Sequence, residues 1–130
     1  MREIKFRAKD TGGEWHYGDL ELPRNGERNP YIHAYKENGE YDRQYPINDD
    51  TIGQFTGLYD KNGREIYEGD IIHLDCVGNF IVGYNKEFCS FELRTQLNDG
   101  GYVDKLWSMD CKRYEIVGNI YDNYKLLNKE

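Results

Sequence analysis

The stretch from Thr56 to Ile72, "TGLYDKNGREIYEGDII", has the densest alternation of apolar and polar residues in the chain. Its Asn62-Gly63 step tolerates the positive φ angles that tight hairpin turns require. Asp60, just before this step, is placed to accept hydrogen bonds from backbone amides later in the turn. The stretch therefore predicts a β-hairpin in which residues 54–59 pair with residues 65–67.

The same stretch also begins like a calcium-binding loop, because Asp60 and Asn62 stand at its first and third positions. An EF-hand loop needs glycine at its sixth position and a bidentate glutamate at its twelfth. Here glycine comes fourth and Ile71 comes twelfth, so the spacing does not fit. The later Gly-Asp step predicts a bend or bulge before an apolar strand. The residues that we expect to form structural turns are Asp60, Asn62, Gly63, Gly69 and Asp70.

The rest of the chain also follows a period of two, which is typical of strands with one buried face. "EIKFRA" and "EWHYGDLEL" flank a glycine-containing turn and predict an N-terminal hairpin within residues 1–22. Residues 23–50 are rich in turn formers and charge and predict an exposed variable loop, with "YIHAY" as a short strand inside it. Whether this loop is ordered or functional is left open.

Residues 51–121 contain short strands separated by clusters of glycine, asparagine and aspartate. This pattern predicts an antiparallel core with an SH3-like barrel portion. "DNYKLLNKE", residues 122–130, predicts a C-terminal helical turn. We therefore expect one mainly β domain of small α+β type over residues 1–130, a length that suits a single domain.

The composition limits which cellular compartment and which classes of partner are expected. The net charge of −7 opposes binding to phosphate backbones and to anionic membranes. The three cysteines, Cys76, Cys89 and Cys111, have no CxxC spacing, and we expect them to be reduced, mostly buried thiols of an intracellular protein. No apolar run reaches a membrane span of about 18 residues, and the N-terminus has no signal-peptide core. The cytoplasm is the expected compartment, with no membrane partner.

Signs of catalysis are few. Neither serine lies in a GxSxG motif, and neither a phosphate-binding loop nor a dinucleotide fingerprint occurs. In "HLDC", His73 and Asp75 would share one face of a strand while Cys76 points to the other. We predict no enzyme activity, no catalytic residue, no metal and no cofactor.

Glu68 and Asp70 are two residues apart and could present a pair of carboxylates, as general acid–base sites do. A role in the turn needs fewer assumptions. Whether Glu68, Asp70, His73 and Asp75 form a site is left open.

Twelve tyrosines bring the aromatic content to 15%. Tyrosine and tryptophan are favoured in protein interfaces, so binding to another protein is the expected function. The contacts that we predict are Trp15, Tyr17, Tyr31 and Tyr35. One alternative is an SH3-like nucleic-acid module, which would need Arg2, Lys5, Arg7 and other basic residues on one face. A second alternative is an acidic DNA mimic, and self-association is left open.

Three segments carry a family resemblance: "MREIKFRA", "IGQFTGLYDKNGREIYEGDI" and "YEIVGNIYDNYKLL". On these segments the chain resembles the YopX family of bacteriophage and prophage proteins. The resemblance implies a compact β-rich fold and an accessory role without an established biochemical function. With it, the expected partner becomes a host or phage protein and the expected compartment the cytoplasm of a bacterial host cell. The resemblance transfers no catalytic residue. In this chain Lys9 stands where the family opening "FRAWD" has tryptophan. If that tryptophan packs on the barrel, either Trp15 takes its role or the first strand is less anchored. The ending "NYKLL" replaces a common "NPELL".

Overall fold

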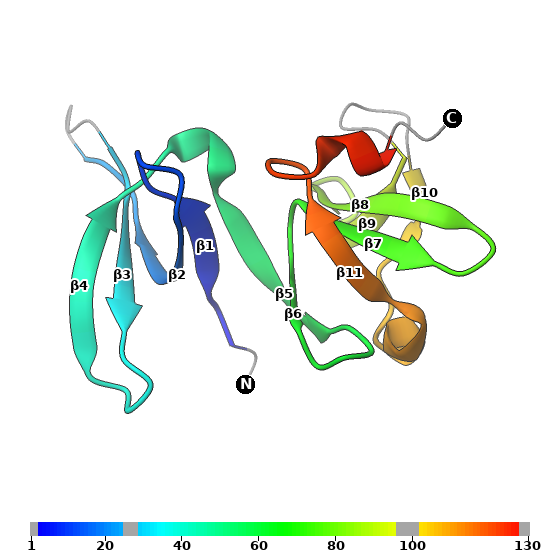
Figure 1. The fold of residues 1–130 in the computed structure, drawn as a ribbon, viewed down its shortest axis with the longest axis horizontal. Coiled ribbons are helices and arrows are strands. Elements are labelled where there is room, and N and C mark those ends of the chain that lie inside the picture. The colour runs from blue at the N-terminus through cyan, green and yellow to red at the C-terminus, as the bar shows by residue number, and fades with distance from the viewer. Residues whose placement is uncertain (1–2, 25–28, 96–101, 128–130) are drawn as a thin grey trace. The chain divides into compact units, whose positions relative to one another are not determined.

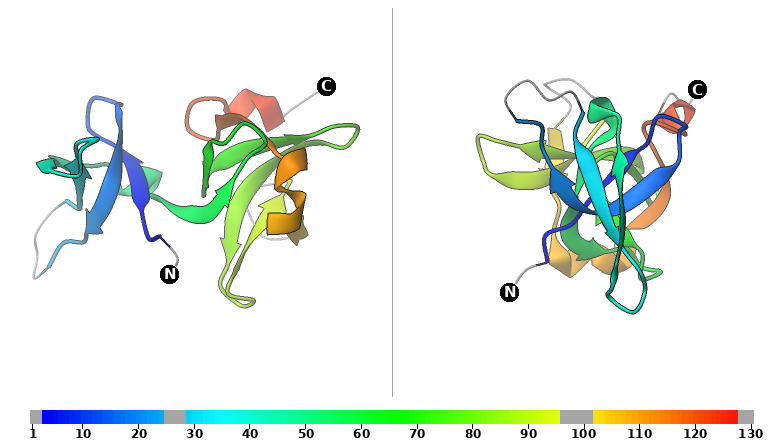
Figure 2. Two further views of the ribbon diagram at one scale, coloured as in Figure 1. Left: turned by 90° about the horizontal axis from the view of Figure 1, so that it is seen from below. Right: turned by 90° about the vertical axis from the view of Figure 1, so that its left-hand side faces the viewer.

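A computed structural model describes residues 3–24, 29–95 and 102–127. The chain divides into two compact units, residues 1–55 and residues 56–130, which we call the N-terminal and the C-terminal unit. Both consist of antiparallel strands and short 3-10 turns (Figures 1 and 2). The mainly β class predicted from the sequence is confirmed.

The N-terminal unit is built on the strands β1 (Phe6–Lys9), β2 (Trp15–Glu21), β3 (Tyr31–Tyr35) and β4 (Tyr41–Pro46) and on the start of β5 (Gly53–Tyr59). They lie in the order β4-β3-β2-β1-β5. β1 and β2 pair as the hairpin that the sequence predicts, and β5 continues into the C-terminal unit.

The segment predicted as a loop, residues 23–50, contains more regular structure than expected. β3 coincides with "YIHAY", β4 pairs with it along its length, and the 3-10 turn η1 (Asp49–Thr51) follows. The sequence does not predict β4 because most of its residues are exposed, so they show no apolar alternation. Pairing with β3 forms this strand.

A small core lies under the N-terminal sheet. Ala8 and Ile32 are fully buried, and Ile47 is almost so. Partly buried Phe6 and Leu20 pack against these three side chains. Of the segment "EIKFRA", Phe6 and Ala8 face this core, as a period of two predicts. Ile4 is 58% exposed and Arg7 is 6% exposed, so the alternation does not hold over the whole segment.

The C-terminal unit contains β6 (Glu65–Tyr67), which pairs with β5, and a five-stranded antiparallel sheet. The strands of that sheet are β7 (Asp70–Leu74), β8 (Gly78–Asn85), β9 (Ser90–Arg94), β10 (Tyr102–Lys105) and β11 (Glu115–Asn119). Their order is β10-β9-β8-β7-β11. The 3-10 turn η2 (Ser108–Arg113) precedes β11.

This sheet is open, which corrects the expectation of a barrel. The outer edge of β11 is covered by side chains rather than by a strand. The amide of Ile116 donates to the Asp60 carboxylate at 3.0 Å, and its carbonyl accepts from Arg64 at 3.2 Å. Because these groups are already satisfied, β11 has no pairing left to offer there.

The core of the C-terminal unit is larger than that of the N-terminal unit. Its buried side chains are Ile66, Ile72, Leu74, Phe80, Val82, Leu93, Tyr114 and Ile116. The predicted C-terminal helical turn is present as η3 (Tyr124–Leu127), and residues 128–130 of that prediction lie outside the described residues. The side-chain amide of Asn79 on β8 donates to the carbonyl of Leu126 at 3.1 Å and holds this turn.

The cysteines are free but not mostly buried, which corrects the expectation. Cys76 and Cys89 are exposed and Cys111 is partly buried. Both exposed cysteines lie in turns between strands, with φ of 66° and 53°. In the part of the chain that the structure describes, no helix has the length and hydropathy needed to cross a bilayer.

Candidate functional site

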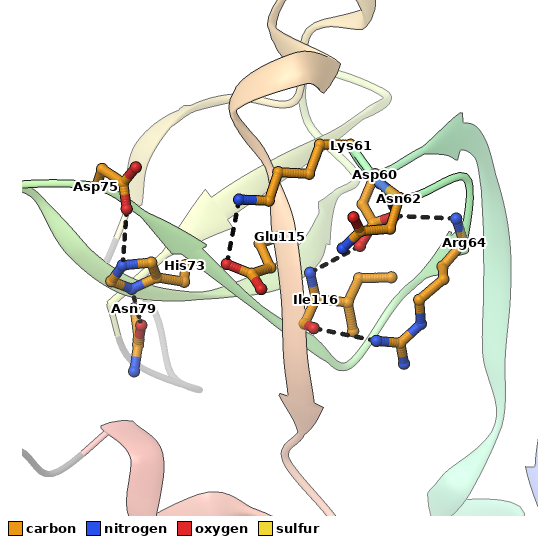
Figure 3. A network of polar contacts seen from close by, with 9 residues as sticks. All are labelled: Asp60, Lys61, Asn62, Arg64, His73, Asp75, Asn79, Glu115 and Ile116. Carbon is orange, nitrogen blue, oxygen red and sulfur yellow. Dashed lines mark hydrogen bonds and ion pairs between the residues drawn. The ribbon is translucent and has the colours of Figure 1, made fainter.

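The Asp60 turn fastens the β5–β6 hairpin to β11 (Figure 3). One oxygen of the Asp60 carboxylate accepts from the amides of Asn62 and Arg64, both at 2.9 Å, and the other accepts from the amide of Ile116. Lys61 adds an ion pair with Glu115 at 3.5 Å. Gly63 has φ of 82°, which the turn requires.

Electrostatics favour the ionised form of Asp60. Burial acts to raise its pKa, but the amides of Ile116, Arg64 and Asn62, together with the charge of Arg64, outweigh burial. The pKa of Asp60 therefore lies below its usual value. Its carboxylate oxygens are engaged by the backbone, and this geometry suits architecture rather than a metal site.

The Gly69-Asp70 bend is also occupied by structural contacts. Asp70 is 2% exposed, and its carboxylate accepts from the amide of Tyr67 at 2.8 Å. The amide of Gly69 donates to Val82, and its carbonyl accepts from Ile120, both at 2.9 Å. These bonds connect the bend to β8 and to the end of β11.

Two of the four acidic and histidine residues considered as a site, Asp70 and His73, make separate contacts. His73 contacts Asp75 at 3.3 Å and Asn79 at 2.8 Å (Figure 3). Asp70 is instead buried against the backbone of Tyr67. A cavity of about 410 Å³ in this unit is lined by residues that include Leu58, Phe91 and Trp107 and by none of these four.

The N-terminal sheet presents a more coherent surface. Alternation along β2 places Trp15, Tyr17, Asp19 and Glu21 on one side of the sheet, and alternation along β3 does the same for Tyr31, His33 and Tyr35. The register sets Asp19 opposite His33 and Glu21 opposite Tyr31, so both sets lie on the same side. Tyr41 of β4 lies opposite Tyr35. We call Tyr17, Asp19, Glu21, Tyr31, His33, Tyr35 and Tyr41 the tyrosine–carboxylate face.

Hydrogen bonds connect the three strands across this face. The hydroxyl of Tyr35 donates to Asp19 at 3.0 Å. His33 lies between Glu21, at 2.7 Å, and the hydroxyl of Tyr41, at 3.1 Å. The rings of Tyr35 and Tyr41 meet edge to face with centroids 5.7 Å apart. The side chains are thus held in place before any partner binds.

The acidic neighbour changes the chemistry of Tyr35. Its hydrogen bond to Asp19, and then the negative charge of Asp19, raise the pKa of Tyr35 above its usual value. The hydroxyl therefore stays a neutral hydrogen-bond donor well above neutral pH.

The four aromatic residues predicted as partner contacts fall on one side of this sheet but differ in access. Tyr17 is 46% and Tyr35 is 50% exposed, whereas Tyr31 is half-buried. Trp15 is covered by two cations, with the Arg7 guanidinium 4.7 Å and the Lys9 ammonium 5.5 Å from its ring centroid. Lys9, where the family has tryptophan, thus packs on Trp15.

The sequence prediction omits Asp19, Glu21, His33 and Tyr41 from the site. Alternation with a period of two from Trp15 places Asp19 and Glu21 on this side of the sheet. Placing His33 and Tyr41 there requires the register between β2, β3 and β4. That register depends on Gly18, where an added Cβ would lie 2.0 Å from the carbonyl oxygen of His33. A strand can approach β2 this closely only where a side chain is absent.

The basic residues of the N-terminus pack against rings rather than forming an open stripe. Lys5 pairs with Glu3 at 3.6 Å and lies 5.7 Å from the Phe55 ring centroid. Arg7 is 6% exposed. Arg2 lies outside the described residues.

One group could offer three ligand atoms to a cation. Asp10, Glu14 and His16 have ligand atoms within 4.8 Å of one another. One oxygen of Asp10 accepts from the amides of Gly12 and Glu14, and the other contacts His16 at 2.8 Å. The hydrogen bond from His16 is the main cause that lowers the pKa of Asp10. These contacts account for the group as a structural turn.

Comparisons with known proteins identify the family of the chain. A search of curated proteins gives no significant match. The crystal structure of protein EF1440 from Enterococcus faecalis is similar, with a TM-score of 0.59 and 25% identity. The match covers 98% of this chain and 99% of that chain. Residues 5–128 match the family described as YopX protein. The chain belongs to the YopX family.

Proposed function

We propose that this YopX protein is a phage- or prophage-encoded accessory protein that acts by binding a host or phage protein through the tyrosine–carboxylate face. The observation that carries the proposal is a set of exposed tyrosines on one sheet, two of which are already held by hydrogen bonds. Tyrosines are common among the residues that dominate binding energy. Because Tyr35 and Tyr41 are tied to neighbours, their ordering costs little free energy on binding.

The surrounding chemistry supports a protein partner over a nucleic acid. Asp19 and Glu21 lie among the tyrosines, and carboxylates repel phosphates. The proposal places the protein in the bacterial cytoplasm, where the three unpaired thiols persist in reduced form. It assigns the protein a binding role and no catalytic one.

The test is affinity capture from nuclease-treated bacterial lysate, read by quantitative mass spectrometry. The variant Tyr17→Ala/Tyr35→Ala removes two exposed rings of the face. The matched control, Tyr59→Ala/Tyr124→Ala, removes two tyrosines of the C-terminal unit that are 45% and 47% exposed. We expect one stoichiometric partner whose recovery falls at least about tenfold with the first variant, as hot-spot truncation predicts. The control should keep it.

Equal recovery with both variants would move the binding surface away from this face and overturn the proposal. A partner captured only without nuclease would instead favour the nucleic-acid module. Circular dichroism and thermal melting of both variants check that each is folded before the recoveries are compared.

A further inference from the structure

The tyrosine–carboxylate face contains a cavity of about 320 Å³ within the N-terminal unit. Its lining includes Tyr17 and Gly18 of β2, with Asp19 next to them, and Tyr35 of β3. Glu3, Ile4 and Lys5 complete the lining. The size is at the lower end of what ligand pockets occupy, which suits one side chain of a partner.

The charge inside this cavity is negative. Lys5 is 3.6 Å from Glu3, so these two charges largely offset each other. Asp19 accepts one hydrogen bond, from Tyr35, and has no cationic partner among the residues that the structure describes. A carboxylate has about four acceptor positions, so Asp19 can still accept hydrogen bonds from a ligand.

Two aromatic rings stand beside this carboxylate. Tyr17 and Tyr35 are 46% and 50% exposed, and both line the cavity together with Asp19. Electron-rich ring faces attract cations, and a carboxylate next to them adds hydrogen-bond acceptors. An anionic or purely apolar ligand would leave Asp19 without compensation for its desolvation.

From this arrangement we propose that the cavity binds an arginine side chain of the protein partner. Arginine fits better than lysine because its planar guanidinium stacks on tyrosine while donating a pair of hydrogen bonds to one carboxylate. It is also less strongly hydrated, so it loses less on leaving water. The inference rests on the proposed function and gives it a chemical class of partner: a protein segment with an exposed arginine.

The test uses the full chain and a probe peptide, acetyl-Gly-Gly-Arg-Gly-Gly-amide, followed by ¹H–¹⁵N NMR. We expect saturable shifts of the amide signals of Tyr17, Gly18, Asp19 and Tyr35. Peptides with citrulline or lysine in place of arginine are the ligand controls. The citrulline peptide keeps the shape without the charge and should give no saturable shifts. The lysine peptide should bind at least about threefold more weakly than the arginine peptide.

Protein variants give the second arm. Asp19→Asn keeps the side-chain shape and should weaken arginine binding about tenfold, since it converts a charge-assisted bond into a neutral one. Lys5→Gln removes the cation that offsets Glu3, which makes the cavity more negative and should strengthen binding about twofold. Asp75→Asn, on a side chain that is 88% exposed in the C-terminal unit, should change nothing.

The inference is overturned if the arginine and citrulline peptides bind equally well. It is also overturned if Asp19→Asn and Lys5→Gln both bind the arginine peptide as the wild type does. Lysine binding as tightly as arginine overturns the choice of arginine. If lysate capture depends on Tyr17 and Tyr35 while the arginine peptide gives no shifts, the proposed function stands and this inference fails. If the arginine peptide gives saturable shifts while lysate capture does not depend on Tyr17 and Tyr35, the proposed function fails and the cavity still binds arginine.

Discussion

Asp60 shows how much one side chain contributes to this fold. Its carboxylate accepts three backbone amides from two places in the chain, including the amide of Ile116 at the edge of β11. It is 5% exposed, so water cannot fully replace those bonds. Asp60 therefore stabilises both its own turn and the edge of the C-terminal sheet.

We predict that Asp60→Ala lowers the free energy of unfolding by about 3 kcal/mol, because buried amides lose their acceptor. Urea denaturation followed by fluorescence measures the change. The control Asp75→Ala removes a largely exposed carboxylate and should cost under about 0.5 kcal/mol. Similar losses for the two variants would contradict the role given to Asp60.

The same residue predicts a dependence on acid. Its pKa is lowered from the usual 3.8 in the folded state, so the ionised carboxylate stabilises the fold. That contribution is complete above the unfolded-state pKa and is lost as the pH falls through 3.8 toward the folded-state value. As the pH falls below 3.8, the stability of the wild type should fall more steeply than that of Asp60→Asn. Parallel acid-unfolding profiles would contradict this.

At the scale of elements, three hairpin turns share one geometry. In the turns that begin at Asp10, Lys36 and Asp60, the amide of the first residue donates to the carbonyl four residues later. The glycine in each turn has positive φ: 90° at Gly13, 91° at Gly39 and 82° at Gly63. This is the three-residue loop that ends in a left-handed glycine and matches the twist of paired strands.

β2 and β3 approach each other closely at Gly18. Gly18→Ala places a Cβ against the backbone of His33, which cannot move as a flexible side chain would. We expect a loss of about 2 kcal/mol or more in the stability of the N-terminal unit, from steric strain. Hydrogen exchange at the amides of β2 and β3 measures it.

Gly12→Ala is the matched control for this substitution. Its added Cβ would lie 3.4 Å from a side-chain oxygen of Asp10, an ordinary contact, and no positive φ is required. Exchange in β2 and β3 should stay close to wild type. If the β2 and β3 amides of Gly18→Ala were as protected from exchange as those of the wild type, the predicted steric clash would be contradicted.

For the whole molecule, the net charge of −7 leads to a prediction about nucleic acid. Non-specific DNA binding derives from cationic contacts that release counterions, and the described basic residues at the N-terminus pack against rings or pair with Glu3. Labelled random DNA, single- or double-stranded, should show no saturable anisotropy change up to about 100 µM protein at low salt. A lysine-rich peptide is the positive control. Binding that disappears with added salt would revive the nucleic-acid alternative.

The sequence by itself determined the features that depend on neighbours along the chain. Alternation in "EIKFRA" and the Asn62-Gly63 step predict the first hairpin and the β5–β6 turn, because side-chain period and backbone φ are local properties. The short helical turn near Leu126 and the family follow in the same way. The mainly β class is a sum of such local signals.

Tertiary structure alone decided what depends on distant partners. β4 exists because β3 pairs with it, and the sheet of the C-terminal unit stays open because Asp60 and Arg64 occupy the edge of β11. The tyrosine–carboxylate face likewise depends on strand register, which a period of two cannot specify between separate segments. Tyr17 and Tyr35 are visible in the sequence as aromatic residues, but only the pairing of β2 with β3 brings Asp19 to the hydroxyl of Tyr35.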